Sequence, residues 1–315
     1  MGEDPGAQSP ADVDSGVADA PGTSDTQTAE ASSPPPVDAA TGDGGCDSTM
    51  PFLTLASLGN SVNTNLDETA PRLTPDELVM YYTQADSLGL YTTRVSRTST
   101  TAPWTGKKTF YDRSVDRVHL WTSSDERRVY YGQRIASSQR WQLIRARLDG
   151  GGGVTYADFA VEIDGPTSDL GPYVAADESE IWWESDRASA TSGVFDIYTA
   201  PELSDGGFGA PQAATALNTP ANEASPVLSA DKLTIYFASS RGRAAGTSIW
   251  MATRLKATDP FSPPVLAPGL GPLEDEKASI PGAAVPGWIS PDACRLYVST
   301  TKDTGSSDLY VASRR

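Results

Sequence analysis

Five short hydrophobic runs recur along the chain, and each follows an acidic residue by a few positions. The first reads Asp76-Glu-Leu-Val-Met-Tyr-Tyr82, and the fourth reads Asp231-Lys-Leu-Thr-Ile-Tyr-Phe237. An apolar or Pro-containing stretch precedes most of the acids, so the pattern predicts β-hairpins with the acid in the turn. A further run rich in β-forming residues follows each hairpin, as at 249–252. The repeated unit is therefore a small antiparallel sheet.

The spacing of the units predicts how the sheets assemble. The opening acids are Asp76, Asp125, Asp177, Asp231 and Asp292, which lie 49, 52, 54 and 61 residues apart. Units of this length, repeated radially with three or four strands each, are typical of a β-propeller. The length of 51–315 favours five blades over six, whereas a β-sandwich would not give this ungapped recurrence. We therefore expect an all-β fold, a single propeller of five blades with about four antiparallel strands each.

The two ends of the repeat region predict how the ring closes. The chain ends in a third strand, whereas 51–60 resembles the outer strand expected after Pro260-Phe261. We expect this N-terminal strand to complete the last blade, which removes the open sheet edges. Cys46 and Cys294 flank the same junction, so they are expected to form a disulfide worth roughly 3–5 kcal/mol in an oxidising compartment. Two unpaired thiols are the alternative.

Residues 1–50 differ sharply from the repeats. They contain ten acids, no Lys or Arg, and no Phe, Tyr, Trp, Ile or Leu. Such a segment has too little apolar surface to offset the entropy of ordering, so we expect a disordered acidic spacer before the propeller domain at 51–315. Its start shows no basic n-region and no apolar h-region. The sequence either belongs to a cytoplasmic protein or begins downstream of a leader, and the spacer favours an exported, surface-tethered protein.

Composition excludes several classes of function. The formal net charge is −17, which argues against nucleic acid as a partner. No run approaches the ~20 apolar residues of a transmembrane helix. A single histidine, His119, and two cysteines argue against a zinc site and against Ser-His-Asp catalysis. We expect no cofactor and a structural role for His119. The glycines at 150–153 lack the following Lys-Ser/Thr of a phosphate loop and are expected to form a flexible connection.

The fourth unit carries a family resemblance. Ser-Pro-Val-Leu-Ser-Ala-Asp-Lys-Leu-Thr-Ile-Tyr-Phe-Ala-Ser-Ser-Arg at 225–241 resembles the WD40-like PD40 repeat of the TolB propeller family. Shorter forms occur in the first, third and fifth units, and the second unit matches weakly. The resemblance implies a bacterial, exported, non-catalytic propeller of the periplasm, in some members a lipoprotein. The α/β domain of TolB is absent here, so the partners of TolB are not carried over.

Candidate site residues open the innermost strands, eight positions before the turn acids. They are Glu68, Arg117, Asp169 and Glu223, with Ala284 in the fifth unit. At the mouth of a channel, three carboxylates and a guanidinium are expected to hold a cation or a polar ligand, or to pair with one another. The five turn acids invite a metal site, but an Asp in a turn more often caps backbone N–H groups, so we expect no metal there. Arg187 and Arg241 are expected to hold blade loops.

These features favour a non-enzymatic binding or scaffold propeller, acting as a monomer in the bacterial envelope. Its location is expected to be the periplasm, the outer membrane or the outside of the cell, and its partner an envelope protein or a peptidoglycan-associated one. A carbohydrate-active enzyme is the alternative, because glycosidases need two carboxylates about 5–10 Å apart. Glu68, Asp169 and Glu223 are the only candidates for that pair. A third possibility is glycan binding without turnover, through Trp104 and Phe208 in loops.

Overall fold

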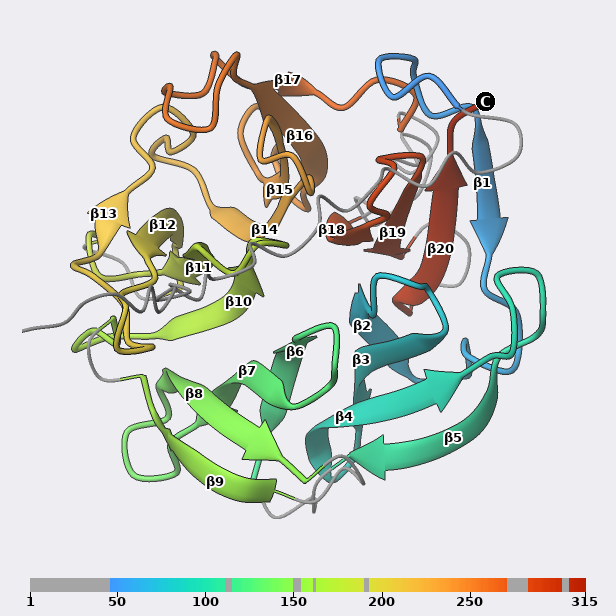
Figure 1. Cartoon of the computed structure of the whole chain (residues 1–315), viewed down its shortest axis with the longest axis horizontal. Helices are drawn as coiled ribbons and strands as arrows, with labels where there is room; N and C mark the ends of the chain where they lie inside the picture. Colours follow the sequence, from blue (N-terminus) through green and yellow to red (C-terminus); the bar gives the residue numbers. More distant parts are fainter. Residues whose placement is uncertain are drawn as a thin grey trace, which may run out of the picture. The chain divides into compact units, whose positions relative to one another are not determined.

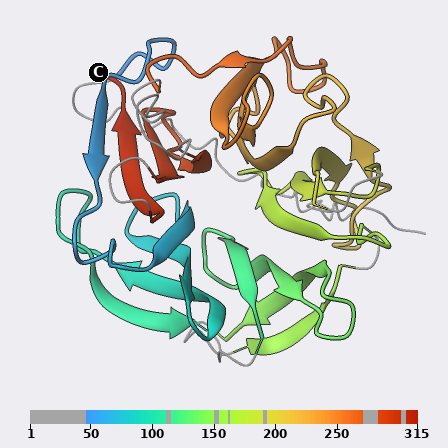
Figure 2. The ribbon, with the colours of Figure 1, turned by 180° about the vertical axis from the view of Figure 1, so that it is seen from behind.

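Five four-stranded antiparallel sheets surround a common axis (Figures 1 and 2), so the fold is an all-β propeller with five blades. The computed structural model describes residues 46–110, 115–149, 154–160, 163–189, 193–270, 283–301 and 306–315. All of them belong to one compact unit, 41–315. Most of the predicted acidic spacer, 1–45, and the glycines at 150–153 lie outside the described residues.

The first four blades follow the order of the chain, from the inner strand to the outer one. Blade 1 contains β2 (Asp67–Leu73), β3 (Val79–Asp86), β4 (Gly89–Ser96) and β5 (Thr105–Phe110). Blade 2 contains β6 (Arg117–Thr122), β7 (Arg128–Arg134), β8 (Trp141–Leu148) and β9 (Val154–Phe159). Blade 3 contains β10 (Asp169–Val174), β11 (Glu180–Ser185), β12 (Asp196–Pro201) and β13 (Gln212–Ala213). Blade 4 contains β14 (Glu223–Leu228), β15 (Thr234–Ser239), β16 (Ser248–Thr253) and β17 (Val265–Leu266).

The last blade joins the two ends of the described chain. Its strands are β18 (Ala284–Ile289), β19 (Arg295–Thr300) and β20 (Asp308–Ser313), and β1 (Thr54–Ser57) forms its outer edge. β1 runs antiparallel to β20, with Thr54 opposite Ser313. The predicted closure by the N-terminal strand is thus confirmed. The disulfide is confirmed too, because Cys46 is bonded to Cys294 with 6.1 Å between the Cα atoms.

A recurrent turn connects the first two strands of every blade. Each turn acid accepts a backbone N–H from the residue two positions later, as Asp231 Oδ1 does from Leu233 at 2.9 Å. The residue between them adopts a left-handed conformation, with φ between 54° and 62°; these are Glu77, Glu126, Glu178, Lys232 and Ala293. Short polar side chains relieve this conformation by satisfying the local backbone. The hairpins therefore share one turn geometry.

Every inner strand contains a bulge. The register to the second strand shifts once in each blade, as it does between Ala224 and Val227 in β14. Four blades place a residue with positive φ at this point, and these residues are Ala70, His119, Gly171 and Ser225. A bulge bends the strand and redirects its side chains. It lies where the inner strands approach the axis, so it determines which groups meet there.

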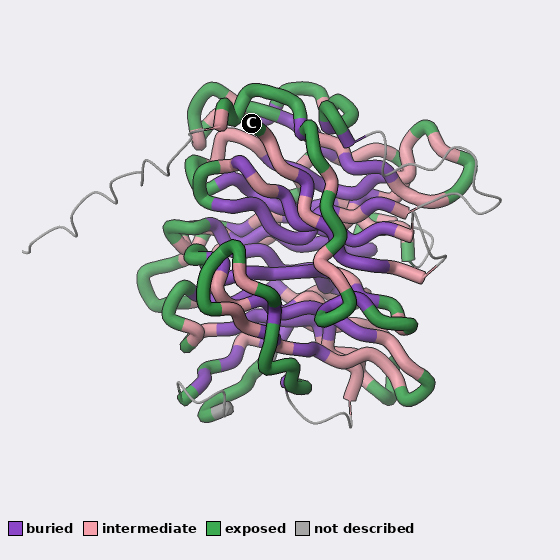
Figure 3. The backbone as a smooth tube through the Cα atoms, turned by 90° about the vertical axis from the view of Figure 1, so that its right-hand side faces the viewer, coloured by how far each residue is buried: buried purple, intermediate pink, exposed green. Residues whose placement is uncertain are grey.

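The inner and second strands of the blades are mostly buried, whereas outer strands such as β5 and the connecting loops are mostly exposed (Figure 3). The largest buried side chains include Trp183, Tyr236, Phe237 and Tyr297, which belong to the second strands of their blades. Aromatic and branched residues of this kind suit a sheet packed on both faces. Within the described residues, no helix is long and apolar enough to cross a membrane.

Candidate functional site

The three carboxylates nominated at the starts of the inner strands are fully buried. Glu68, Asp169 and Glu223 each have 0% of their surface exposed. Glu223 accepts hydrogen bonds from Thr219 Oγ1 at 2.8 Å and Ser239 Oγ at 2.7 Å, and it forms an ion pair with Arg241 at 3.1 Å. A buried charge with this many partners stabilises the blade that surrounds it. We therefore assign Glu223 a structural contact within blade 4.

Asp169 and Glu68 repeat this arrangement with other partners. Asp169 accepts from Trp183 Nε1 at 2.9 Å and forms an ion pair with Arg187 at 2.5 Å. Glu68 accepts from Gln84 Nε2 at 2.7 Å and from Thr64 Oγ1 at 2.5 Å. In each case the carboxylate joins its inner strand to the end of the second strand and to the loop that leads into the blade. None of these bonds reaches another of the nominated residues.

Blades 2 and 5 lack the carboxylate. Arg117 occupies the position in blade 2, is half-buried, and donates from Nε to Gln133 Oε1 at 3.2 Å. Ala284 stands opposite Thr300 in blade 5. The four residues nominated as a ligand-binding group thus lie at equivalent places around the ring, but each is engaged with its own blade. Ligand binding by them stays a prediction.

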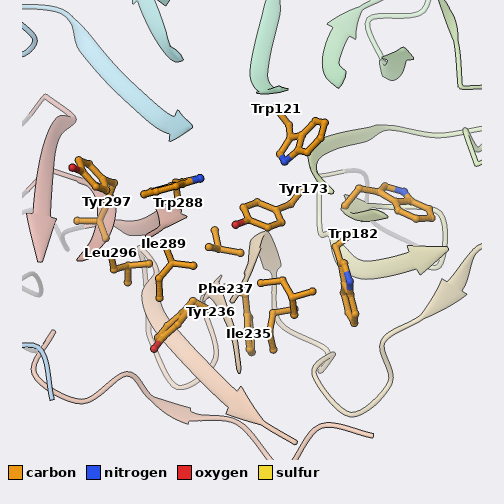
Figure 4. Close-up of a cluster of buried hydrophobic side chains, with 14 of the residues drawn as sticks. Trp121, Tyr173, Trp182, Ile235, Tyr236, Phe237, Trp288, Ile289, Leu296 and Tyr297 are labelled. Carbon is orange, nitrogen blue, oxygen red and sulfur yellow. The ribbon is translucent and has the colours of Figure 1, made fainter. Parts of the chain in front are cut away.

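A different cluster lies where the five inner strands meet. We call it the axial cluster, and its members come from all five blades: Arg72, His119, Tyr173, Glu184, Ser225 and Gly287. The Arg72 guanidinium lies over the Tyr173 ring, 5.4 Å from its centroid, which joins blades 1 and 3 across the axis. Arg72 also donates to the carbonyl of Gly287 in blade 5. Side chains thus cross the axis, and the rings of Trp121, Tyr173 and Trp288 lie around the same space (Figure 4).

Glu184 is the acidic member of the axial cluster. Its Oε2 accepts from the backbone N–H of Ser225 at 2.5 Å, and its Oε1 lies 3.9 Å from His119 Nδ1. Burial raises the pKa of Glu184 to about 7, although the Ser225 hydrogen bond and the Arg72 charge both lower it. A Cβ atom at Gly171 would lie 3.0 Å from Cδ of Glu184, so the glycine leaves room for the carboxyl group.

Burial lowers the pKa values of the two basic members of the axial cluster, His119 and Arg72. Burial, assisted by the Arg72 charge, lowers the pKa of His119 to about 3, so the imidazole is neutral at pH 7. Burial also lowers the pKa of Arg72 to about 10. Among the described residues, Nε and Nη2 of Arg72 and Nδ1 of His119 have no hydrogen-bond partner. The axial cluster thus combines a carboxyl group whose pKa is raised by burial with two basic groups whose pKa values are lowered by burial.

Sequence reasoning missed Arg72 and Glu184. Arg72 occupies an inner-strand position where the other blades have Trp121, Tyr173, Val227 and Trp288, all buried. A charged residue at a predicted core position was the available signal. Glu184 lies next to the Ser-Asp-Arg motif of blade 3, which drew attention to Arg187 instead. The position of His119 at the axis follows from its bulge, which the sequence pattern does not show.

The two motif arginines and the two loop aromatics make contacts that support the fold. Arg187 and Arg241 donate to the carbonyls of Ile163 and Leu217 as well as to the carboxylates of their blades, so the predicted role in holding blade loops is confirmed. The prediction of exposed loop aromatics is wrong. Trp104 is 5% exposed beneath Arg97, and Phe208 is 3% exposed against Tyr130. Both rings fill space between loop and sheet.

The turn acids also have local partners. Asp76, Asp125 and Asp231 each accept from the Ser or Thr hydroxyl two positions earlier. Asp177 is bound by Lys232 of the next blade at 2.7 Å, and Asp292 by Arg295 at 3.1 Å. Among the described residues, no group of three or more His, Cys, Asp or Glu side chains is arranged to hold a metal ion.

Comparison with known proteins finds similarity in fold. No protein-family model matches the sequence, and no curated protein matches it. Among solved structures, a thermostable family-43 glycoside hydrolase is 16% identical with a TM-score of 0.54, over 80% of this chain and 90% of that one. The endo-arabinase of Bacteroides thetaiotaomicron is 13% identical with a TM-score of 0.52, over 84% and 97%.

TolB from Acinetobacter baumannii is also similar, with 13% identity and a TM-score of 0.47 over 80% of this chain. The chain spans 56% of the length of that TolB chain. At these identities the likeness is one of fold. The expected propeller is confirmed by the structure itself, and function must be argued from the residues of this chain.

Proposed function

We propose that the protein is a non-enzymatic binding propeller of the bacterial cell envelope, whose rigid ring presents loops to a protein or peptidoglycan-associated partner. One observation carries the proposal. A glycosidase would need two carboxylates across an open groove. The three candidates, Glu68, Asp169 and Glu223, are instead fully buried and hydrogen-bonded within their own blades. Catalysis by a carboxylate pair needs room for the sugar between the two groups.

A binding propeller is expected to use one face of the ring. The strands of a blade are antiparallel, so the β3–β4 turn and the β16–β17 loop lie on opposite faces. Leu88 in that turn is 76% exposed, and Leu255 in that loop is 90% exposed. These two leucines form a matched pair of probes, because they have the same side chain and both are solvated.

The test places a photo-crosslinking amino acid at Leu88 or at Leu255 in the full-length protein and irradiates living cells. We expect one probe to capture a specific envelope protein or peptidoglycan fragment reproducibly, while the other does not. Equal capture by both probes, or by neither, would contradict the proposal. The purified protein is also incubated with plant and bacterial glycans, where mass spectrometry is expected to show no cleavage products.

The Cys46–Cys294 bond supports a location in the periplasm, at the outer membrane or outside the cell, because structural disulfides persist in oxidising compartments. Thiol titration under denaturing conditions tests this for protein isolated from its own host without reductant. We expect no reactive thiol, whereas two would favour the cytoplasm.

A carbohydrate-active propeller is the second candidate. The two glycoside hydrolases among the similar structures support it at the level of fold alone. Asp169 is the residue to test, since it opens the inner strand of blade 3. Cleavage of a glycan by the wild-type protein, abolished in a folded Asp169→Asn variant, would favour this candidate over the binding function.

A further inference from the structure

A groove opens between blade 2 and the loop that joins β12 to β13 in blade 3. Its volume is about 770 Å³, which lies in the range of small-ligand sites. Buried Tyr130 and Phe208, whose ring centroids are 5.6 Å apart, contribute to its floor. Tyr156 and Leu203 line it with 47% and 46% of their surfaces exposed. The groove is thus partly apolar and accessible.

Three arginines also line the groove, in a protein whose formal net charge is −17. Arg128 on β7 stands directly opposite Arg147 on β8, which in turn stands opposite Tyr156 on β9. Like charges at directly opposed positions destabilise a sheet. The same two positions in blade 4 hold Thr234 and Thr253. Blade 2 thus carries two opposed arginines that its own repeat does not require, which is typical of a functional surface.

The arginines differ in how far their charges are neutralised. Arg128 forms ion pairs with Glu178 and with Glu202, the latter at 3.1 Å. Arg145 donates to the carbonyl of Gly206 at 3.2 Å. Arg147 is exposed, and within the described part of the chain its guanidinium has no carboxylate partner. Arg147 therefore offers an uncommitted planar donor set beside the exposed ring of Tyr156.

An acidic side chain in the groove, Asp205, limits how much negative charge a ligand can carry. Asp205 lies in the same groove, and its Oδ1 accepts from the N–H of Gly207 at 2.9 Å, while its Oδ2 has no hydrogen-bond donor among the described residues. A strongly acidic peptide would meet Asp205 together with the two glutamates on Arg128, and like charges brought together in this way oppose binding. A ligand with one carboxylate and several hydroxyl groups satisfies both Arg147 and Asp205.

We propose that this groove binds a short saccharide that carries a carboxylate, with the carboxylate on Arg147 and a sugar ring against Tyr156. Guanidinium groups bind carboxylates with two parallel hydrogen bonds, which gives both affinity and orientation. Hydroxyl groups of the sugar donate to Asp205. The assignment rests on the proposed binding function in one respect, namely that the bound saccharide is not cleaved.

Isothermal titration of the full-length protein with galacturonosyl-galactose, which carries one carboxylate, and with the neutral digalactose, tests the assignment. We expect saturable binding of the acidic sugar and binding of the neutral one weaker by about tenfold or more. Arg147→Thr introduces the residue that blade 4 carries at this position, and it is expected to weaken the acidic sugar to the level of the neutral one. Tyr156→Ala should weaken both sugars. Arg315→Thr, which removes the same charge from the exposed end of blade 5, should change neither.

Several outcomes would overturn the assignment. These are the absence of any binding heat, equal affinity for the two sugars, and unchanged affinity in Arg147→Thr. Tighter binding of a tetraglutamate peptide through Arg147 would assign the groove to acidic peptides instead. The mass of the sugar after titration separates this proposal from the proposed function. Arg147-dependent binding of a sugar that is cleaved would support the site and overturn the non-enzymatic function. An intact sugar whose binding does not depend on Arg147 would overturn the site and leave the non-enzymatic function standing.

Discussion

Blade 4 and blade 2 have the same four-stranded topology but use it differently. In blade 4 the inner strand begins with Glu223, which is buried and bonded to Ser239 and Arg241. In blade 2 the same position holds Arg117, which is half-buried and bonded to Gln133. Blade 4 also matches the repeat most closely in sequence, whereas blade 2 matches it weakly. Blade 4, which matches the repeat, has a buried carboxylate at the start of its inner strand. Blade 2, which departs from the repeat, carries the groove.

This difference separates residues that build a blade from residues available for binding. A buried carboxylate with several partners inside its own blade has a structural role that its contacts explain. The arginine-lined groove of blade 2 shows the opposite features, namely exposure, two directly opposed arginines, and the Arg147 guanidinium, which has no carboxylate partner among the described residues. Repetition in sequence therefore marks structure in this protein, and departure from repetition marks the candidate surface.

The largest effect is expected when the ion pair between Glu223 and Arg241 in blade 4 is broken. Glu223→Ala leaves the partly buried Arg241 without its carboxylate, and removal of one member of a buried ion pair typically costs about 3–5 kcal/mol. Arg117→Ala at the matching position of blade 2 is expected to cost less, about 1 kcal/mol, because its contact with the neutral amide of Gln133 is half-buried. The measurement is the free energy of unfolding from urea titration, with far-UV circular dichroism as the probe.

Glu223→Gln serves as the control, since it keeps the shape and the hydroxyl contacts while removing the charge. It should fall between the wild type and Glu223→Ala. Equal losses for Glu223→Ala and Arg117→Ala would show that the two blades are held in the same way, and the distinction between them would fail.

The second prediction concerns the axis, where blades 2 and 4 place His119 and Ser225 at the same repeat position on either side of Glu184. Below pH 6.5 the unfolded chain binds a proton at His119. In the folded protein the pKa of His119 is about 3, so the imidazole stays neutral. Between pH 4.5 and 7 the folded protein holds a proton on Glu184 that the unfolded chain releases. The two contributions have opposite signs, so they largely cancel between pH 4.5 and 6.5.

Two variants separate these contributions. His119→Ser, which copies blade 4, should gain stability relative to the wild type as the pH falls from 6.5 to 4.5. Glu184→Gln should lose stability relative to the wild type as the pH falls from 7 to 4.5. Each difference is expected to reach at most about 1 kcal/mol per pH unit. The His119 effect should be the smaller, because 18% of that side chain stays exposed. Parallel pH profiles for both variants and the wild type would show that neither group is perturbed by the fold.

Much of the ring could be predicted from sequence, and the reason is physical. Turn acids, strand patterns and the repeat length are local features, and ring closure follows once 51–60 is read as an outer strand. The axial contacts of Arg72 and Glu184 could not be predicted, because they join residues of different blades that lie between 41 and 215 positions apart in the sequence and meet at bulges. The burial of Glu68, Asp169 and Glu223 was missed as well, because strand periodicity does not show the loops that cover a strand start.

The smallest expected effect sharpens the comparison most. Arg147→Thr replaces a groove residue of blade 2 with its counterpart in blade 4, where Thr234 and Thr253 face each other without repulsion. Relief of the like-charge pair should leave the free energy of unfolding unchanged or raise it by a few tenths of a kcal/mol. A loss above about 1 kcal/mol would mean that Arg147 supports the blade, as Glu223 does. A neutral or slightly stabilising substitution that also removes saccharide binding would show that blade 2 gives up stability at this position in exchange for recognition.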